Sequence, residues 1–400
     1  MPNENTNKLL WTALVLIEYF VIFVAAYFFS LKSGNLGLAI DGLTGQNDSY
    51  FYYNQIIANM GNSQLTNESG TLFIPVMTMI SHFFNSASVF LLKFINFMGF
   101  PILLVAIMNL VNSISKVTGL AGNRVSSEVM FRMAIFPSSI LAVAIPFGRD
   151  VWIYVFFMLS VRRLIVFLFT GHSLVDLIFF IVYVYLLYGF RAYAALSVVI
   201  GALVFFLIRN ISKSRLLLLI SVGIISFIVW FQFFSTVTIP VVGLSLADAI
   251  KFQSGVSLNE LGMIVNQRTG GSDFMGVFNT SDVFVFVAQI IFSYIGNLIS
   301  PFIWQLDSVS MFPIFIFESL PMIYLIGRLL RKKTDFVVFL KINPALTLVV
   351  SQVLTWWTML AITNKNVGTG MRLKVPLFIF IWIVYYFYIG FKKKKDERSE

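Results

Sequence analysis

Two carboxylates and a group of aromatic residues lie close together in a turn-rich stretch near the amino terminus. Asp48 lies two residues before the first of the aromatic residues, and turn-forming residues surround Asp41. A carboxylate in such a place can accept the proton of a hydroxyl nucleophile as a general base, and aromatic rings can stack against a sugar ring. We therefore predict Asp48 as the first catalytic candidate, Asp41 as the weaker one, and Tyr50, Tyr52 and Tyr53 as substrate-binding residues.

Asp48 has a second interpretation as a helix cap. A short helix is expected over residues 49–59, and Asp is favoured at the N-cap position of helices. A cap needs only a hydrogen-bond acceptor, whereas a base needs the negative charge as well. Both roles remain open from the sequence.

Five basic residues form the second group of candidates, because each lies at or near the expected end of an apolar segment: Arg149, Arg191, Arg268, Arg372 and Lys374. The arginine side chain binds phosphate through a planar pair of N–H donors, so several arginines on one face predict a phosphorylated ligand. Glycines beside Arg268 and before Arg372 can add backbone amides to such an anion site. Two alternatives stay open. Arg149 can pair with Asp150, and Arg372 and Lys374 can anchor the chain at the membrane interface.

The sequence does not contain the residue patterns of the common metal and hydrolase sites. It has no cysteine and only two histidines, His82 and His172, which are expected on opposite faces of the membrane. A two-histidine metal site and a Ser-His-Asp triad are therefore not predicted. The cofactor that the pattern leaves open is a Mg²⁺ or Mn²⁺ ion on the Asp48 carboxylate.

The composition places the chain among membrane proteins. Of its 400 residues, 58% are hydrophobic and only 12% are charged, which is about half the share of charge in a soluble domain. Apolar runs close to the roughly 20 residues that cross a bilayer recur along the chain. We therefore predict an all-α, polytopic helical bundle, in which residues 1–400 form a single membrane domain.

The net charge of +10 has its largest block in a basic tail, residues 392–400, directly after the last apolar run. Lysine and arginine concentrate in the cytoplasmic loops of membrane proteins, next to anionic lipid. We therefore interpret this charge as a topology signal and expect no nucleic acid as a partner.

The basic loops orient about ten predicted spans, with both termini in the cytoplasm. Three of the spans are expected between residues 150 and 209, and the others at about 9–30, 88–111, 128–146, 216–234, 311–329, 336–361 and 373–391. Two long segments, 31–87 and 235–310, then lie outside, together with the acidic and basic candidates. An interfacial or re-entrant helix is expected at 71–84, and a second one at 283–299 unless that stretch crosses the membrane.

Four short pieces of the chain, spread over most of its length, resemble a known superfamily. They are Asp48-Ser49-Tyr50, the stretch from Phe136-Pro137 to Arg149-Asp150, the piece Pro301 to Gln305 ahead of a span that bears Glu318, and Met371 to Pro376. Together they resemble bacterial polytopic glycosyltransferases of the GT-C type and the related surface-polysaccharide polymerases of O-antigen or exopolysaccharide assembly. The resemblance implies a catalytic acid in the first outer loop and a donor sugar on an isoprenoid phosphate such as undecaprenyl phosphate. It also implies substrate-binding roles for Trp304, Gln305 and Glu318.

The function predicted from the sequence is that of a cell-membrane enzyme. It would transfer a sugar or oligosaccharide from a polyprenyl-phosphate or diphosphate carrier to an acceptor on the outer face. Its expected partners are the lipid-linked saccharide, membrane lipids and other polysaccharide-assembly proteins. The alternative is a transporter or flippase of lipid-linked saccharides, with Glu18, Arg132 and Asp176 as candidate charges inside the membrane.

Overall fold

The structure, a computed structural model, describes residues 4–40, 46–61, 70–211, 282–306 and 311–397, together with short pieces between 215 and 279. The chain is a multi-pass helical membrane protein, because seven segments of this part are helical, long and apolar enough to cross a bilayer. They are α1 (Glu4–Lys32), α4 (Val89–Phe97) joined to α5 (Gly99–Thr118), α8 (Asp150–Phe169), α10 (Ala192–Asn210), α14 (Met311–Ile314) joined to α15 (Leu320–Arg331), α17 (Pro344–Thr363) and α19 (Val375–Asp396). A π-helical turn, Phe315–Ser319, connects α14 to α15.

Shorter elements connect and cap these helices. The helices are α2 (Gln46–Gly61), α3 (Phe73–Phe83), α6 (Gly122–Ala134), α7 (Pro137–Val143), α9 (Leu174–Phe190), α13 (Val283–Ile299), α16 (Lys333–Ile342) and α18 (Val367–Leu373), with a 3₁₀ turn at Ile303–Gln305. Two antiparallel pairs of very short strands lie within residues 235–310, β1 (Thr238–Ile239) with β2 (Leu244–Ser245) and β3 (Val256–Leu258) with β4 (Ile264–Gln267). Apart from these short strands, the regular structure of the described residues is helical, and the predicted all-α class is confirmed.

The third predicted span, 128–146, is broken in the structure. α6 ends at Ala134 and α7 begins at Pro137. Proline has no N–H for the helical hydrogen bond and moves the residue before it out of the α conformation; Phe136 accordingly has φ −108° and ψ 88°. After the break, residues 144–149 connect the end of α7 to the start of α8.

The count of ten spans stays a prediction. α9 has 17 residues, fewer than the roughly 20 of a typical span, and α6 with α7 forms an interrupted segment. The predicted span at 216–234 lies outside the described residues. The predicted span at 336–361 divides at Pro344, so that α16 is a separate short helix and α17 is the long apolar one.

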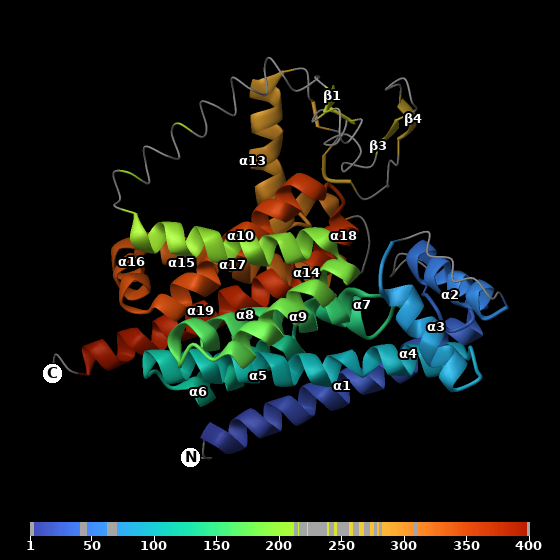
Figure 1. Ribbon diagram of the computed structural model, residues 1–400, viewed down its shortest axis with the longest axis horizontal. Helices are drawn as coiled ribbons and strands as arrows, with labels where there is room; N and C mark the ends of the chain where they lie inside the picture. The colour runs from blue at the N-terminus through green and yellow to red at the C-terminus, as the bar shows by residue number, and fades with distance from the viewer. Residues whose placement is uncertain are drawn as a thin grey trace.

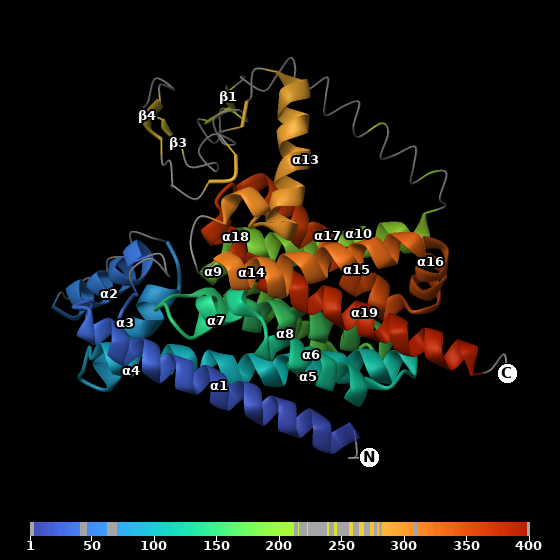
Figure 2. The same cartoon turned by 180° about the vertical axis from the view of Figure 1, so that it is seen from behind.

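The long helices run side by side along the longest direction of the molecule (Figure 1). The amino-terminal end of α1 and the carboxyl-terminal end of α19 lie at the same end of the bundle, whereas α2, α3, α7 and α18 lie at the opposite end (Figures 1 and 2). α13 crosses the direction of the long helices and projects from the bundle. The interfacial or re-entrant placement of residues 283–299 stays a prediction.

Aromatic side chains fill the contacts between the helices. The ring of Tyr19 in α1 stacks on Phe100 in α5 with 4.0 Å between the centroids. Phe136, at the break between α6 and α7, stacks on Phe378 of α19. The indole of Trp356 is fully buried against Phe157 of α8. Because such rings bury large apolar areas, the packing holds the end of the bundle near α7 and α18 in place.

We predict that Ser33→Cys, at the end of α1, reacts with a membrane-impermeant thiol reagent in intact cells, whereas Ser173→Cys reacts only after permeabilisation. Ser33 and Ser173 are both exposed, and they follow helices that end at opposite ends of the bundle. The chain has no native cysteine, so the labelling has no background from the protein. Labelling of Ser173→Cys in intact cells, with Ser33→Cys protected, would reverse the predicted orientation.

Candidate functional site

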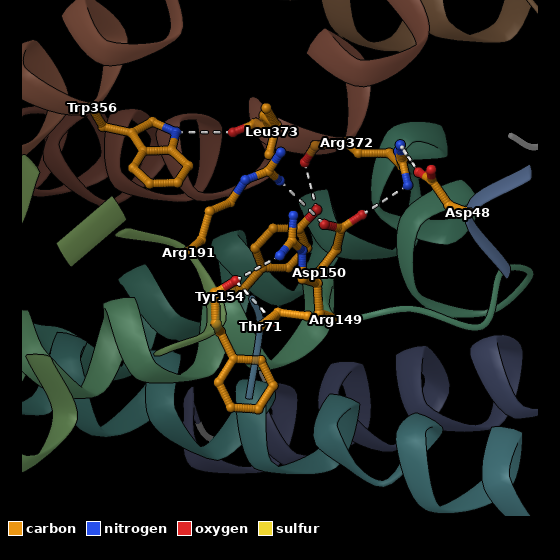
Figure 3. Close-up of polar contacts among 10 residues, drawn as sticks. Asp48, Thr71, Arg149, Asp150, Tyr154, Arg191, Trp356, Arg372 and Leu373 are labelled. Carbon is orange, nitrogen blue, oxygen red and sulfur yellow. Dashed lines mark hydrogen bonds and ion pairs between the residues drawn. The ribbon is translucent and has the colours of Figure 1, made fainter. Parts of the chain in front are cut away.

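Five charged side chains from distant parts of the chain meet at the α2 and α18 end of the bundle (Figure 3). Asp48 lies in the first turn of α2, Arg149 and Asp150 at the start of α8, Arg191 between α9 and α10, and Arg372 in the last turn of α18. We call these five residues the charged cluster. Asp48, Arg149, Arg191 and Arg372 are predicted site residues, and the fold brings all four together.

Arg372 lies at the centre of the charged cluster. Its Nη1 is 3.2 Å from Oδ2 of Asp150, and its Nη2 is 3.0 Å from Oδ2 of Asp48. Arg191 Nη1 lies 3.6 Å from the other carboxylate oxygen of Asp150. The Asp150 side chain is only 9% exposed, whereas that of Asp48 is 54% exposed. Asp150 is therefore the inner carboxylate that two arginines share, and Asp48 is the outer one.

Helix ends position the charges of the cluster. Asp48 and Asp150 lie in the first turns of their helices, where the positive end of the helix dipole stabilises a carboxylate. Arg372 lies in the last turn of α18, where the negative end stabilises a cation. Arg191 has an extended backbone conformation, φ −163° and ψ 102°, between two helices. Asp48 is not the N-cap, because α2 already begins at Gln46.

Arg149 ties the start of α8 to the link between α9 and α10. Its Nη1 donates a hydrogen bond of 3.1 Å to the carbonyl oxygen of Phe190. The Thr71 hydroxyl donates to the same carbonyl, and the Leu72 N–H donates to Gly189. Among the described ion pairs, Asp150 binds Arg191 and Arg372, so the alternative pair of Arg149 with Asp150 is not what the structure contains.

Buried side chains donate hydrogen bonds to the backbone of the last turn of α18. The Tyr154 hydroxyl donates to the carbonyl of Arg372, and the indole N–H of Trp356 donates to the carbonyl of Leu373 at 2.9 Å (Figure 3). At the other end of α18, the side chain of Asn366 caps the first turn. The backbone that carries the central guanidinium is thus fixed at both ends.

The cluster has an excess of positive charge. Three arginines against two carboxylates leave one positive charge, which favours an anionic ligand. Burial opposes the charge of Arg372, but the carboxylates of Asp150 and Asp48 outweigh burial and raise the pKa of this guanidinium above its ordinary value. Burial also raises the pKa of Tyr52 above its ordinary value.

The charged cluster borders a hollow that Ser49, Tyr52 and residues 146–148 also line. The hollow has a volume of about 30 Å³, room for only one or two water molecules. A phosphate group is larger, so it fits only when one of the ion pairs opens. Asp48 is the member with the freedom to move, because it lies at the exposed edge and accepts one hydrogen bond from Arg372.

Of the three predicted substrate-binding tyrosines, Tyr52 lies at the hollow. Its ring is 8% exposed and packs edge-on against Phe73. The Tyr50 hydroxyl donates to the side-chain oxygen of Asn35, and the Tyr53 hydroxyl donates to the carbonyl of Ala87. These two tyrosines attach α2 to its neighbours. The sequence alone does not distinguish tyrosines with this role from tyrosines that stack against a sugar ring.

Lys374 and Glu318, predicted as donor-binding and substrate-binding residues, lie in the interior and bind each other. Lys374 Nζ is 2.7 Å from Oε2 of Glu318, and both side chains are fully buried. The backbone N–H and the hydroxyl of Ser138 donate to the Glu318 carboxylate, and Lys374 also donates to the carbonyl of Ser300. A buried charge without a partner raises the free energy of the folded protein, and the pairing of Lys374 with Glu318 avoids this cost. Because the two residues bind each other, neither belongs to the charged cluster.

The remaining predicted residues lie elsewhere. Trp304 is 71% exposed, and its ring stacks on Phe302 at 4.7 Å. The Gln305 side chain accepts a hydrogen bond from the backbone N–H of Phe302. Neither residue lines the hollow of the charged cluster. Asp41 and Arg268 lie outside the described residues.

Asp150 is the member of the charged cluster that the sequence did not single out as a candidate. It is visible in the sequence only as one half of an Arg-Asp dipeptide, which suggests a local pair. In the fold it bridges Arg191, which lies between α9 and α10, and Arg372, which lies in α18. A carboxylate at the first residue of a membrane-crossing helix, at the same end as two arginines, is the signal that points to it.

The donor set of the cluster does not fit a divalent metal ion. No three His, Asp or Glu side chains converge in the part of the chain that the structure describes. The two carboxylates of the charged cluster already bind guanidinium groups. The Mg²⁺ or Mn²⁺ that the sequence left open is therefore given no role at Asp48.

Arginine guanidinium groups in this arrangement can bind a phosphate or diphosphate through paired N–H donors. Comparisons of the chain with protein-family models, with curated proteins and with solved structures found no match. The chemistry of the charged cluster is therefore the basis for assigning a function.

We predict that Asp150→Asn destabilises the protein more than Asp48→Asn does. Removing the Asp150 charge leaves two partly buried arginines without their shared partner, which costs on the order of 3 kcal/mol. The Asp48 pair is half exposed and contributes about 1 kcal/mol or less. Unfolding of the two purified variants in the same detergent checks the order. Equal melting temperatures would mean that Asp150 does not hold the cluster together.

Proposed function

We propose that the protein is a membrane glycosyltransferase that takes a sugar or oligosaccharide from a polyprenyl-phosphate or diphosphate carrier. The acceptor is a hydroxyl group at the outer end of the bundle. Arg191 and Arg372, with Arg149 beside them, bind the phosphate of the carrier, and Asp48 receives the proton of the acceptor hydroxyl.

One observation carries the proposal. Three arginines and two carboxylates from four separate segments converge at one end of a membrane bundle, around a hollow with an excess of positive charge. A lipid phosphate lies at this level of a membrane, while its isoprenoid chain lies among the apolar helices. A phosphate-binding site at a helix end next to lipid is therefore suited to a lipid-linked donor.

The geometry suggests how donor binding prepares the base. The donor phosphate competes with Asp48 for the Arg372 guanidinium, because Asp48 is the more exposed of its two partners. A carboxylate released from an ion pair is a better proton acceptor. Asp150 remains on Arg372 and Arg191 and holds both guanidinium groups in position.

The transfer step then forms one bond and breaks one. The acceptor oxygen bonds to the anomeric carbon of the sugar, and the bond between this carbon and the phosphate oxygen breaks. The bonding electron pair leaves with the phosphate, whose developing charge the arginines stabilise. The proton of the acceptor hydroxyl moves to Asp48.

The second candidate function, a transporter or flippase of lipid-linked saccharides, has one observation in its favour. The pair of Glu318 with Lys374 is fully buried in the helical bundle, and buried charges in membrane helices often mark the path of a substrate. Of the other candidate charges, Arg132 donates to the hydroxyl of Tyr386, and Asp176 pairs with Arg163. A transporter would move the saccharide without making a glycosidic bond.

We predict that Asp48→Asn lowers glycosyl transfer about 100-fold or more and does not weaken donor binding, because the neutral amide competes less with the donor phosphate for Arg372. The amide keeps the shape of the carboxylate and can still accept a hydrogen bond from Arg372, but it cannot take up the proton. The measurement is product formation from a lipid-linked saccharide by the purified protein in nanodiscs, together with binding of the same donor.

Asp41→Asn is the matched variant in the same loop. Wild-type turnover by Asp48→Asn would exclude Asp48 as the base, and loss of turnover in Asp41→Asn alone would move that role to Asp41. Movement of the saccharide across the membrane without product formation by the wild-type protein would favour the transporter instead.

A further inference from the structure

A second cavity lies at the other end of the bundle, between α16 and α19. Its volume is about 430 Å³, within the range of sites that bind small molecules and much larger than the hollow of the charged cluster. α16 and α19 contact each other, and the cavity lies where α19 ends, at the opposite end from α2 and α18 (Figure 2). It is therefore separate from the proposed phosphate site of the donor.

The walls of the cavity combine apolar and basic residues. Val338, Ile342 and Phe391 supply the apolar part. The basic part consists of lysines from the end of α19: Lys392, Lys394 and Lys395. Asp335 and Asp396 also line the cavity, so three positive charges face two negative ones. The excess of positive charge beside an apolar wall suits a ligand with an anionic head and a hydrocarbon tail.

The side chain of Tyr388 is an independent sign of a ligand. Tyr388 lines the cavity and is only 3% exposed, with its ring packed against Phe336 and Phe339. Within the described residues, its buried hydroxyl has no hydrogen-bond partner. A buried polar group without a partner costs free energy, and an oxygen of a bound anion would remove this cost.

We propose that this cavity binds an anionic phospholipid. The lysines and the Tyr388 hydroxyl contact the phosphodiester headgroup, and the apolar wall contacts the upper part of an acyl chain. Basic pockets beside membrane-crossing helices, such as α19, bind lipid headgroups in this way. A small hydrophilic anion would gain nothing from the apolar wall, and the cavity exceeds what such an anion fills. The proposal is independent of the glycosyl transfer proposed for the other end.

Lys393 provides a matched control within the same run of four lysines. It does not line the cavity; its side chain is 64% exposed and pairs with Glu397 at 3.8 Å. General attraction of a basic tail to an anionic membrane depends on the number of lysines, so replacing Lys393 or Lys394 would weaken it equally. Lipid binding at a defined site would depend on Lys394 and not on Lys393.

The test measures lipid bound to the full chain, purified in detergent, by native mass spectrometry. Phosphatidylglycerol is compared with phosphatidylcholine that has the same acyl chains. We expect the wild-type protein to retain phosphatidylglycerol in preference. Lys394→Gln and Tyr388→Phe should each weaken this binding about tenfold, because each loses a hydrogen bond to a charged group, whereas Lys393→Gln should stay within twofold of the wild type.

Three outcomes would overturn the proposal. Equal weakening by Lys393→Gln and Lys394→Gln would show attraction by the tail as a whole. Equal retention of the two lipids would show that the headgroup is not recognised. Displacement of the lipid by millimolar inorganic phosphate would show a simple anion site. The exposed position of Lys394 means that Lys394→Gln tests the site even if the buried change Tyr388→Phe impairs folding.

Discussion

The guanidinium of Arg372 is the group on which the α2 and α18 end of the molecule depends. It has two carboxylate partners, Asp48 and Asp150, and the second of these also binds Arg191. A charge at the boundary of a membrane bundle needs partners close by, because the neighbouring apolar region solvates it poorly. This requirement joins α2, the start of α8, the link after α9 and the last turn of α18 into one cluster.

Two cations that are close in sequence, Arg372 and Lys374, have different partners at this end of the bundle. Arg372 belongs to the charged cluster, which borders a hollow, while Lys374 is fully buried and binds Glu318. The buried pair fastens the start of α19 to the π-helical turn that carries Glu318 and, through Ser138, to the start of α7. The inner pair therefore fixes the backbone, and the charged cluster is the site that we propose for a ligand. The ion pair of Asp48 is the exposed one, and it is the pair that a ligand can replace at the lowest cost.

The sequence predicted the membrane class and most of the residues of the charged cluster. Apolar runs of about 20 residues define membrane helices, and charges at their ends that share a face must lie at the same level. Arg149, Arg191 and Arg372 could therefore be placed together with Asp48.

Composition and spacing cannot predict the direction of a side chain or the partner that it binds. Lys374 and Glu318 look like outer candidates in the sequence but are buried with each other, and Asp150 looks like the local partner of Arg149 but bridges two other arginines.

The position of a bound lipid phosphate tests the central claim most directly. A cryo-electron microscopy map of the protein in nanodiscs with a polyprenyl phosphate would locate it. We expect phosphate density within hydrogen-bond distance, about 3 Å, of the guanidinium groups of Arg191 and Arg372, with Asp48 moved away from Arg372 and Asp150 still in place. Phosphate density in the middle of the bundle beside Glu318 and Lys374, with the ion pair of Asp48 and Arg372 intact, would contradict it.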